Sequence, residues 1–236
     1  MENAPTVSTK KNCVLLVSGG IDSTTMLAQL TKQGYNVVSV FIDYGQENIN
    51  PTLTSAMHYT KLYNSDLKLV KLNYEWSKAS IIKGNYIDEN ITEENVYSVD
   101  VKALSWVPAR NANMLLMAGG IASEMNIKEV YCSFQFDKSE WKTYDELRLK
   151  CKFPAADLSP RFLLYMNKLA NFCYKTKVVF KAPYIKERLD CKEIVQKGKE
   201  INVDYSKTYS CRYCINGKPC GKCEQCVIRK QRLSNV

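Results

Sequence analysis

Short apolar runs alternate along this chain with longer segments in which apolar residues recur every three or four positions. The apolar runs predict buried strands at 13–18, 36–43, 66–73, 129–134 and 177–184. The periodic segments predict helices at 23–34, 52–64, 111–126, 160–175 and 191–200. Strands that alternate with helices form right-handed crossovers and a mostly parallel sheet with helices on both faces. The pattern therefore predicts an α/β fold of the Rossmann-like type.

The same pattern suggests how the 236 residues divide. We expect a disordered N-terminal lead over 1–12, a nucleotide-binding α/β domain over 13–204 and a small cysteine-rich C-terminal segment over 205–236. Residues 74–103 are polar and irregular, which is typical of an insertion or a flexible loop. Neither a signal peptide nor an apolar run long enough to span a bilayer is visible, so we predict a cytoplasmic protein without membrane contact.

The formal net charge of +9 favours anionic ligands such as nucleotides. It also permits nucleic-acid binding, but the basic residues are scattered and form no long run. Nucleic acid is therefore not indicated as a partner.

The stretch SGGIDST, residues 18–24, connects the first predicted strand to the first predicted helix. In parallel sheets, ligands bind beyond the carboxyl ends of the strands, where this turn lies. Gly19 and Gly20 allow the backbone to approach a ligand, and the hydroxyls of Ser18, Ser23 and Thr24 can donate hydrogen bonds. Unpaired N–H groups at the helix start add to an anion site. We expect this turn to bind phosphate; the alternative is a glycine-rich turn that only caps a helix.

An aspartate is unexpected in an anion site, which makes Asp22 the informative residue of the turn. Its carboxylate can handle a metal ion or orient the loop. The stretch is neither the G-x-x-x-x-G-K-[ST] loop nor the G-x-G-x-x-G fingerprint.

Five of the ten cysteines lie between residues 211 and 226. The spacing of Cys220, Cys223 and Cys226 places three thiolates on one knuckle, and one upstream cysteine would complete a tetrahedral zinc site without an open position. Spacing alone allows either Cys211 or Cys214 as that ligand. An iron–sulfur cluster and unligated cysteines are the alternatives to a structural zinc.

SGGIDS resembles the S-G-G-x-D-S signature of the PP-loop ATP pyrophosphatases, which split ATP into AMP and pyrophosphate. Further stretches narrow the resemblance: FIDYGQ at 41–46, WVPARN at 106–111, DLSPRF at 157–162 and the tail with S-C, then C-G-x-C-x-x-C, then a basic helix. In this order they resemble the 7-cyano-7-deazaguanine synthases, the QueC family, over residues 13–233. The tail is the most specific part of the resemblance.

The resemblance implies a ligase that converts 7-carboxy-7-deazaguanine and ammonia to 7-cyano-7-deazaguanine (preQ0) at the expense of ATP, in queuosine biosynthesis. It implies Mg²⁺ with the ATP, a structural Zn²⁺ and a homodimer.

Site residues follow from the resemblance by matching motif. ATP would be bound by Val17, Ser18, Gly19, Gly20, Ile21, Asp22, Ser23, Thr24, Asp43, Tyr44 and Gln46. The deazaguanine substrate would be bound by Arg110, Asn111 and Asp157. Catalysis would depend on Ser18, Asp22 and Arg110. Zinc would be held by Cys211, Cys220, Cys223 and Cys226, which leaves Cys214 spare.

Each of these residues also has an ordinary structural interpretation. Arg110 can be a surface arginine paired with a carboxylate, and Asp157 can be the N-cap of the helix that follows it. Asp43 and Tyr44 can be turn residues. We expect the single histidine, His58, to be an ordinary packed or exposed residue.

The chain departs from the family pattern in the region expected to border the acceptor. Ala109 stands where the family has a glycine, and Ser159 stands where it has an arginine. A glycine near Ser133 is also missing, and extra residues occupy 134–160. A PP-loop enzyme with another acceptor, such as a tRNA base or a protein, is therefore an alternative. A non-catalytic, zinc-containing nucleotide-binding module is another, and ATP turnover distinguishes it from an enzyme.

Overall fold

The computed structural model describes residues 11–84, 91–96, 98, 105–136, 141, 156–214 and 218–234. Most of the lead predicted at 1–12 lies outside these residues, as does much of the segment 134–160. The predicted irregular region 74–103 is described in part, and it contains the short helix α3 (Ser80–Lys83).

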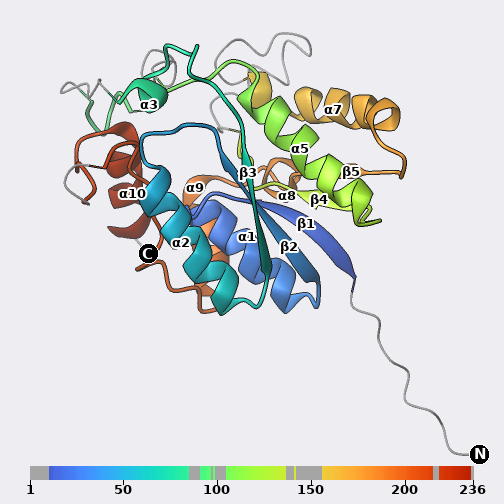
Figure 1. Cartoon of the computed structure of the whole chain (residues 1–236). Helices are drawn as coiled ribbons and strands as arrows, with labels where there is room; N and C mark the ends of the chain where they lie inside the picture. Colours follow the sequence, from blue (N-terminus) through green and yellow to red (C-terminus); the bar gives the residue numbers. More distant parts are fainter. Residues whose placement is uncertain are drawn as a thin grey trace, which may run out of the picture.

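A parallel sheet of five strands forms the centre of the described structure (Figure 1). Its strands are β1 (Asn12–Val17), β2 (Asn36–Asp43), β3 (Asp66–Lys71), β4 (Glu129–Tyr131) and β5 (Val179–Lys181). They run in the order β3-β2-β1-β4-β5, and every neighbouring pair is parallel. The predicted α/β fold is confirmed. The last two strands are shorter than predicted. After β4, residues from Ser133 to Phe136 line a cavity, and after β5 the short helix α8 (Pro183–Lys186) begins.

Helices cover both faces of this sheet (Figure 1). On one face lie α1 (Ile21–Lys32), α2 (Ile49–Leu62) and α9 (Cys191–Lys199); on the other lie α5 (Arg110–Glu124) and α7 (Pro160–Cys173). Because side chains alternate along a strand, β1 serves both layers. Val14 and Leu16 pack in the α5 layer, whereas Leu15 packs in the α1 layer. Burial of these two apolar layers is the main force that holds the helices on the sheet.

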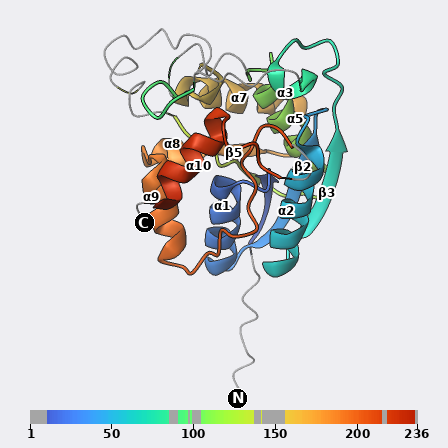
Figure 2. The ribbon, with the colours of Figure 1, turned by 90° about the vertical axis from the view of Figure 1, so that its left-hand side faces the viewer.

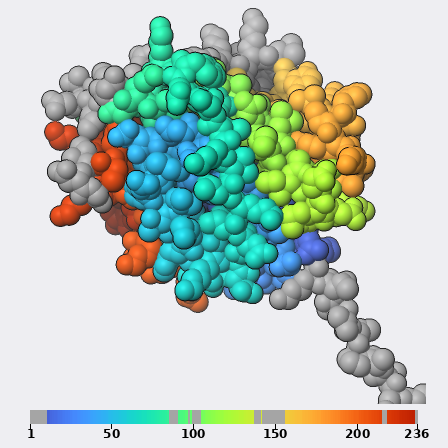
Figure 3. Space-filling model, viewed as in Figure 1, coloured from blue at the N-terminus to red at the C-terminus, as the bar shows by residue number. Residues whose placement is uncertain are grey.

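The space-filling view looks onto α2 and the edge strand β3, with α5 and α7 beside them (Figure 3). Most side chains of β3 are exposed or half-buried, as an edge strand allows. His58 is exposed on α2, where its ring lies edge-on to Tyr59 with centroids 4.9 Å apart, so it is the ordinary histidine that we expected. Among the described residues, no helix has both the length and the apolar character needed to cross a membrane.

The C-terminal segment docks against the α1 and α2 side of the domain and ends in α10 (Glu224–Ser234), which packs on α9 (Figure 2). The hydroxyl of Tyr205 lies 2.7 Å from Oγ1 of Thr25 in α1. The N–H of Tyr209 donates to the carbonyl of Gly19 at 2.9 Å, and the Asn48 amide donates to the carbonyl of Cys211 at 2.6 Å. The segment is thus fixed to the turn after β1 and to the start of α2. The division at residue 204 stays a prediction.

Candidate functional site

A cavity of about 490 Å³ lies at the carboxyl ends of β1, β2 and β4. Ser18, Tyr44 and Phe134, which follow these three strands, contribute to its wall. The start of α5 and the C-terminal segment complete it. This is the position at which parallel α/β sheets bind ligands, and most of the residues predicted for ATP and substrate meet there.

The turn after β1 is shorter than predicted. Ile21 to Thr24 form the first turn of α1, so the loop itself consists of Ser18, Gly19 and Gly20. The Ser18 N–H donates to Oγ of Ser23 at 3.1 Å, and that hydroxyl donates to the carbonyl of Gly20 at 3.3 Å. Ser23 therefore fixes the loop from within, and it does not line the cavity.

The two glycines of the loop have different roles. Gly19 has a φ of +72°, and a Cβ there would lie 2.3 Å from the carbonyl oxygen of Thr52. The Gly19 carbonyl also accepts a 2.7 Å hydrogen bond from Ser55 in α2. Gly19 thus allows close packing on α2, whereas Gly20 lines the cavity.

The start of α1 presents unpaired donors next to this loop. The first intrahelical bond is donated by Thr24 to the carbonyl of Gly20 at 3.1 Å. The N–H groups of Ile21, Asp22 and Ser23 have no partner among the described residues. Together with the positive end of the helix dipole they form an anion site at the cavity.

Asp22 is paired with an arginine from the other end of the chain. Nη1 of Arg232 lies 3.3 Å from Oδ2 of Asp22, and Nη2 contacts Oδ1. Nε of Arg232 donates to the carbonyl of Cys191 at 3.2 Å. The Arg232 side chain is only 8% exposed, and desolvation disfavours its charge. The charge and hydrogen bonds of Asp22, together with smaller contributions from Cys191 and Tyr205, nevertheless raise its pKa. Arg232 thereby joins α10 to the starts of α1 and α9.

The residues after β2 divide between the cavity and the turn. Tyr44 and Gln46 line the cavity, and the Gln46 carboxamide accepts from the Tyr44 N–H at 2.8 Å. Asp43 does not line it; its carboxylate accepts from the N–H of Gly45 at 3.0 Å. Gly19, Ser23 and Thr24 are likewise absent from the wall. These four residues, which were predicted to bind ATP, therefore lie outside the cavity wall and pack next to residues that form it.

Arg110 and Asn111 begin α5 and both line the cavity. The guanidinium carbon of Arg110 lies 5.3 Å from the centre of the Tyr44 ring, and its Nε donates to Oδ1 of Asn111 at 3.3 Å. The preceding residue, Ala109, has a φ of +58°. This is the left-handed conformation that glycine adopts without steric cost, which explains why a glycine suits this position in the family pattern.

Asp157 lies in the 3₁₀ turn η1 (Ala156–Leu158) and lines the same cavity as Arg110. Burial raises the pKa of its carboxyl, and the nearby positive charge of Arg110 opposes that shift. Asp157 is not the N-cap of α7, which was its alternative interpretation. Ser159 is the N-cap, because its hydroxyl accepts from the N–H of Phe162 at 3.2 Å.

The C-terminal segment adds polar residues to the cavity that no sequence motif indicated. Nε of Arg212 donates to Oε1 of Glu224 at 2.5 Å, and Ser105 donates to the same oxygen at 3.3 Å. Arg212, Glu224 and Arg232 all line the cavity. The available signal was their position beside or just beyond the cysteines in C-R-Y-C and C-E-Q-C-V-I-R-K-Q-R, which we interpreted only as a zinc segment with a basic helix.

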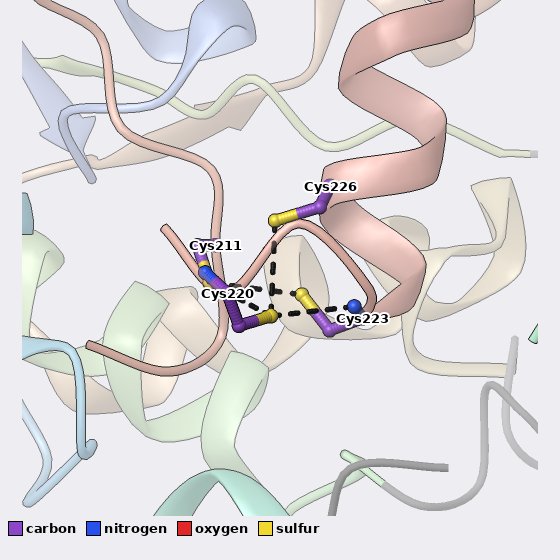
Figure 4. A group of neighbouring side chains, drawn as sticks. All are labelled: Cys211, Cys220, Cys223 and Cys226. Atoms are coloured by element: carbon purple, nitrogen blue, oxygen red, sulfur yellow. Dashed lines mark hydrogen bonds between the residues drawn. The ribbon is translucent and has the colours of Figure 1, made fainter. Parts of the chain in front are cut away.

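Four cysteines at the start of α10 and in the loop before it lie together (Figure 4). The sulfur atoms of Cys211, Cys220, Cys223 and Cys226 all lie within 4.8 Å of one another, and Cys214 is not in the group. Sulfur–sulfur distances of 3.4, 3.8 and 4.0 Å are near the edge of about 3.8 Å in a tetrahedron with a metal–sulfur distance of about 2.3 Å. The group can hold one tetrahedral metal ion.

The backbone around these sulfurs also suits thiolates. N–H groups of Tyr213 and Cys220 point to the sulfur of Cys211 at 3.3 and 3.2 Å, and the N–H of Arg212 points to the sulfur of Cys223 at 3.5 Å. Such donors stabilise negatively charged sulfur and orient metal ligands. In a four-iron cluster each cysteine binds a different iron, so the sulfurs stand further apart than they do here.

The chain is similar to known proteins over almost its whole length. Residues 12–236 match the family described as "Queuosine biosynthesis protein QueC". The chain is 30% identical to the 7-cyano-7-deazaguanine synthase of Saccharophagus degradans, over 96% of this chain and 94% of that protein. It is also 30% identical to the enzyme of that name from Methanococcus maripaludis, over 96% and 95% of the two chains.

Among solved structures, a 4-thiouridine synthetase in complex with RNA and ATP is similar with a TM-score of 0.46 and 19% identity. The match covers 95% of this chain and 51% of that one. Similarity of this degree carries no conclusion about ligand or activity.

Proposed function

Because the chain belongs to the family of the queuosine biosynthesis protein QueC, we propose that it synthesises 7-cyano-7-deazaguanine from 7-carboxy-7-deazaguanine and ammonia with ATP. The observation that best supports this activity is the single cavity that unites the turn after β1 with Arg110, Asn111 and Asp157. A nucleotide and a second, ring-shaped substrate can meet there, as the reaction requires.

In this reaction ATP activates the substrate twice, first as the carboxylate and then as the amide. A carboxylate oxygen of the substrate attacks the α-phosphorus of ATP, and pyrophosphate leaves. Ammonia then attacks the acyl carbon and displaces AMP, which gives the amide. The amide oxygen attacks a second ATP in the same way, and loss of AMP and protons leaves the nitrile. Each step is catalysed chiefly by holding the reactants in line and stabilising phosphoryl charge.

The residues around the cavity fit these tasks. The free N–H groups at the start of α1 and the Ser18 hydroxyl are suited to the phosphates of ATP. Tyr44 and Gln46 lie beside them for the remainder of the nucleotide. Arg110 is positioned to stabilise charge on a phosphate or a carboxylate.

Asp157 lines the same cavity as Arg110 and can accept hydrogen bonds from the ring N–H and exocyclic amine of a deazaguanine. A carboxylate oxygen is the acceptor that such paired donors favour. The burial of Asp157 is consistent with a site that shields part of a flat ring from water.

Two metal ions complete the proposal. We assign Zn²⁺ to Cys211, Cys220, Cys223 and Cys226, because four thiolates in a closed tetrahedron are typical of structural zinc. Mg²⁺ would accompany ATP and screen its charge. Asp22 is tied to Arg232, so its role is to orient the loop unless Mg²⁺ displaces that arginine. A homodimer and a cytoplasmic location stay predictions.

The proposal is tested by measuring AMP and pyrophosphate release by the purified protein. With Mg²⁺ and ammonium present, release should depend on added 7-carboxy-7-deazaguanine. A deazaguanine that lacks the carboxylate is the matched control and should not support release. Release that ignores the acceptor, or that needs a tRNA or a protein instead, would contradict the proposed substrate.

A further inference from the structure

The three arginines that line the cavity engage their guanidinium groups in different ways. Arg232 uses both Nη groups on Asp22, and Arg110 lies over the Tyr44 ring and donates from Nε to the neutral amide of Asn111. Arg212 uses only Nε, which donates to Glu224. Neither of its Nη groups has a hydrogen-bond partner within the part of the chain that the structure describes.

The pair of Arg212 and Glu224 is oriented by its surroundings. The Glu224 side chain is 9% exposed and is held by Ser105 as well, whereas the Arg212 side chain is 22% exposed and lines the cavity. The carboxylate is thus the less exposed member of the pair, although it lines the cavity as well. It engages Nε of the arginine and leaves both Nη groups without a hydrogen-bond partner among the described residues.

The backbone holds Arg212 equally firmly. Its N–H points to the sulfur of Cys223, and the preceding residue, Cys211, is bonded through its carbonyl to Asn48. Tyr209, three residues before Arg212, donates its N–H to the carbonyl of Gly19 in the loop. The cysteine group thus presents this guanidinium at a fixed place along the wall that begins at the phosphate-binding turn.

We propose that Arg212 is an oxyanion-binding residue of the cavity, which takes a phosphoryl or carboxylate group of a substrate through its two free Nη groups. A planar guanidinium binds both kinds of oxyanion by two parallel hydrogen bonds. This proposal adds a binding residue to the site of the proposed function. If the bound group is the substrate carboxylate, the proposal rests on that function. It makes the cysteine-rich segment part of the binding site as well as a structural element.

The first test uses the unaltered protein. Phenylglyoxal modifies accessible arginines, and the modified positions can be mapped by mass spectrometry. Arg212 should be modified, and either inorganic pyrophosphate or 7-carboxy-7-deazaguanine should protect it. Protection by pyrophosphate identifies a phosphoryl site, and protection by the deazaguanine identifies a carboxylate site. If neither protects it, the proposal is wrong, whatever the activity of the enzyme.

The second test measures the affinity of variants for the same two compounds by calorimetry. R212Q should weaken binding of the protecting compound by about 10- to 100-fold, as expected for loss of charge-assisted hydrogen bonds, and leave the other nearly unchanged. R212K keeps the positive charge but lacks the planar guanidinium with its two Nη groups, so its loss of affinity should be smaller than that of R212Q. K218Q removes an exposed charge from the same segment and should change neither affinity.

Zinc content and the thermal midpoint of each variant serve as structural readouts. An R212Q protein with wild-type zinc content and wild-type affinity for both compounds would overturn the proposal. If that protein still releases AMP in the presence of the acceptor, the proposed function stands while this inference fails.

Discussion

Arg232, close to the C-terminus, pairs with both carboxylate oxygens of Asp22 at the start of α1. The two residues are separated by 210 positions in sequence. The pair connects α10, and therefore the cysteine group at its start, to the turn that we assign to the phosphates of ATP. The C-terminal segment is thereby coupled to the site.

Replacing Arg232 should lower the stability of the fold and remove a contact that holds the loop after β1. R232Q leaves the Asp22 carboxylate without its partner, and we expect the free energy of unfolding to fall by about 1–3 kcal/mol, less than for a fully buried pair because Asp22 is 27% exposed. Urea denaturation measures the change. A double-mutant cycle with D22N should show coupling between the two sites; strictly additive effects would contradict the pairing.

The Asp22 carboxylate should also matter for turnover. D22N replaces an ionic partner of Arg232 by a neutral one and should lower acceptor-dependent AMP release by about 100-fold or more, while the protein stays folded. Near-normal turnover in a folded D22N protein would remove this carboxylate from the function.

The two glycines of the loop should differ in their response to alanine. G19A places a Cβ against the backbone of Thr52 at a φ of +72° and should destabilise the protein by about 2 kcal/mol or more. G20A is its matched control, because the nearest atom to a Cβ there is Oγ of Ser18 at 3.3 Å. Thermal unfolding distinguishes them, and equal midpoints would be inconsistent with the packing of Gly19 on α2.

Replacing Ala109 by glycine should stabilise the chain. At a φ of +58° an L-residue is less favourable than glycine by about 1 kcal/mol. We expect A109G to raise the thermal midpoint by about 2–4 °C. A112G, inside α5, should lower it by a similar amount, since glycine is unfavourable in a helix. A midpoint lowered by A109G would show that the left-handed conformation is not relevant to stability.

Much of this architecture follows from the sequence because each layer has a local signal. Alternating β1 side chains such as Val14 and Leu15 serve two apolar layers, and an all-parallel sheet follows from strand and helix alternation. The turn at Ser18 could be located for the same reason. The different roles of Gly19 and Gly20 in this turn could not be predicted, because the packing of Gly19 on Thr52 depends on α2, which lies more than thirty residues further along the chain.

The contributions of the C-terminal segment to the cavity were beyond sequence reasoning. Arg212 and Arg232 stand among other basic residues, and spacing does not tell a buried cation from a solvated one. Their partners, Glu224 and Asp22, become neighbours only after the segment folds back over α1. Cys211 and Cys214 were equally acceptable ligands by spacing, and only the course of the backbone brings Cys211 to the others.

The cysteine group should respond to single substitutions as a four-ligand site. C223S should lose bound metal and lower the thermal midpoint, since the metal stabilises a segment with a small core. C214S is the matched control and should keep both. Metal analysis of the purified proteins measures the stoichiometry. Metal loss in the C214S protein would exclude this set of ligands.

The buried carboxyl of Asp157 should give stability a pH dependence. Burial raises its pKa above the ordinary value of 3.8, so the folded state favours the protonated form. The resulting stabilisation is present below that value and is lost as the pH rises through the raised pKa. D157N lacks this dependence, so its stability relative to wild type should increase from about pH 4 to about pH 7.

Asp204 provides the opposite case for this comparison. Hydrogen bonds from Ser206 lower its pKa, and its contribution is lost as the pH falls, so D204N should become less stable relative to wild type as the pH rises. Denaturant melts at about pH 4 and pH 7 measure D157N, and melts at about pH 2 and pH 5 span the lowered pKa of Asp204 and measure D204N. The same trend in both would show that the shift does not arise from the burial of Asp157.

The proposed activity is tested most directly by mass spectrometry of the nucleobase after incubation of the purified protein with 7-carboxy-7-deazaguanine, ammonium, Mg²⁺ and ATP. We predict that the nitrile is formed, together with AMP and pyrophosphate in matching amounts. An amide as the only product would mean that the second activation is missing. A carboxylate recovered unchanged by a protein that still binds ATP would contradict the proposed acceptor.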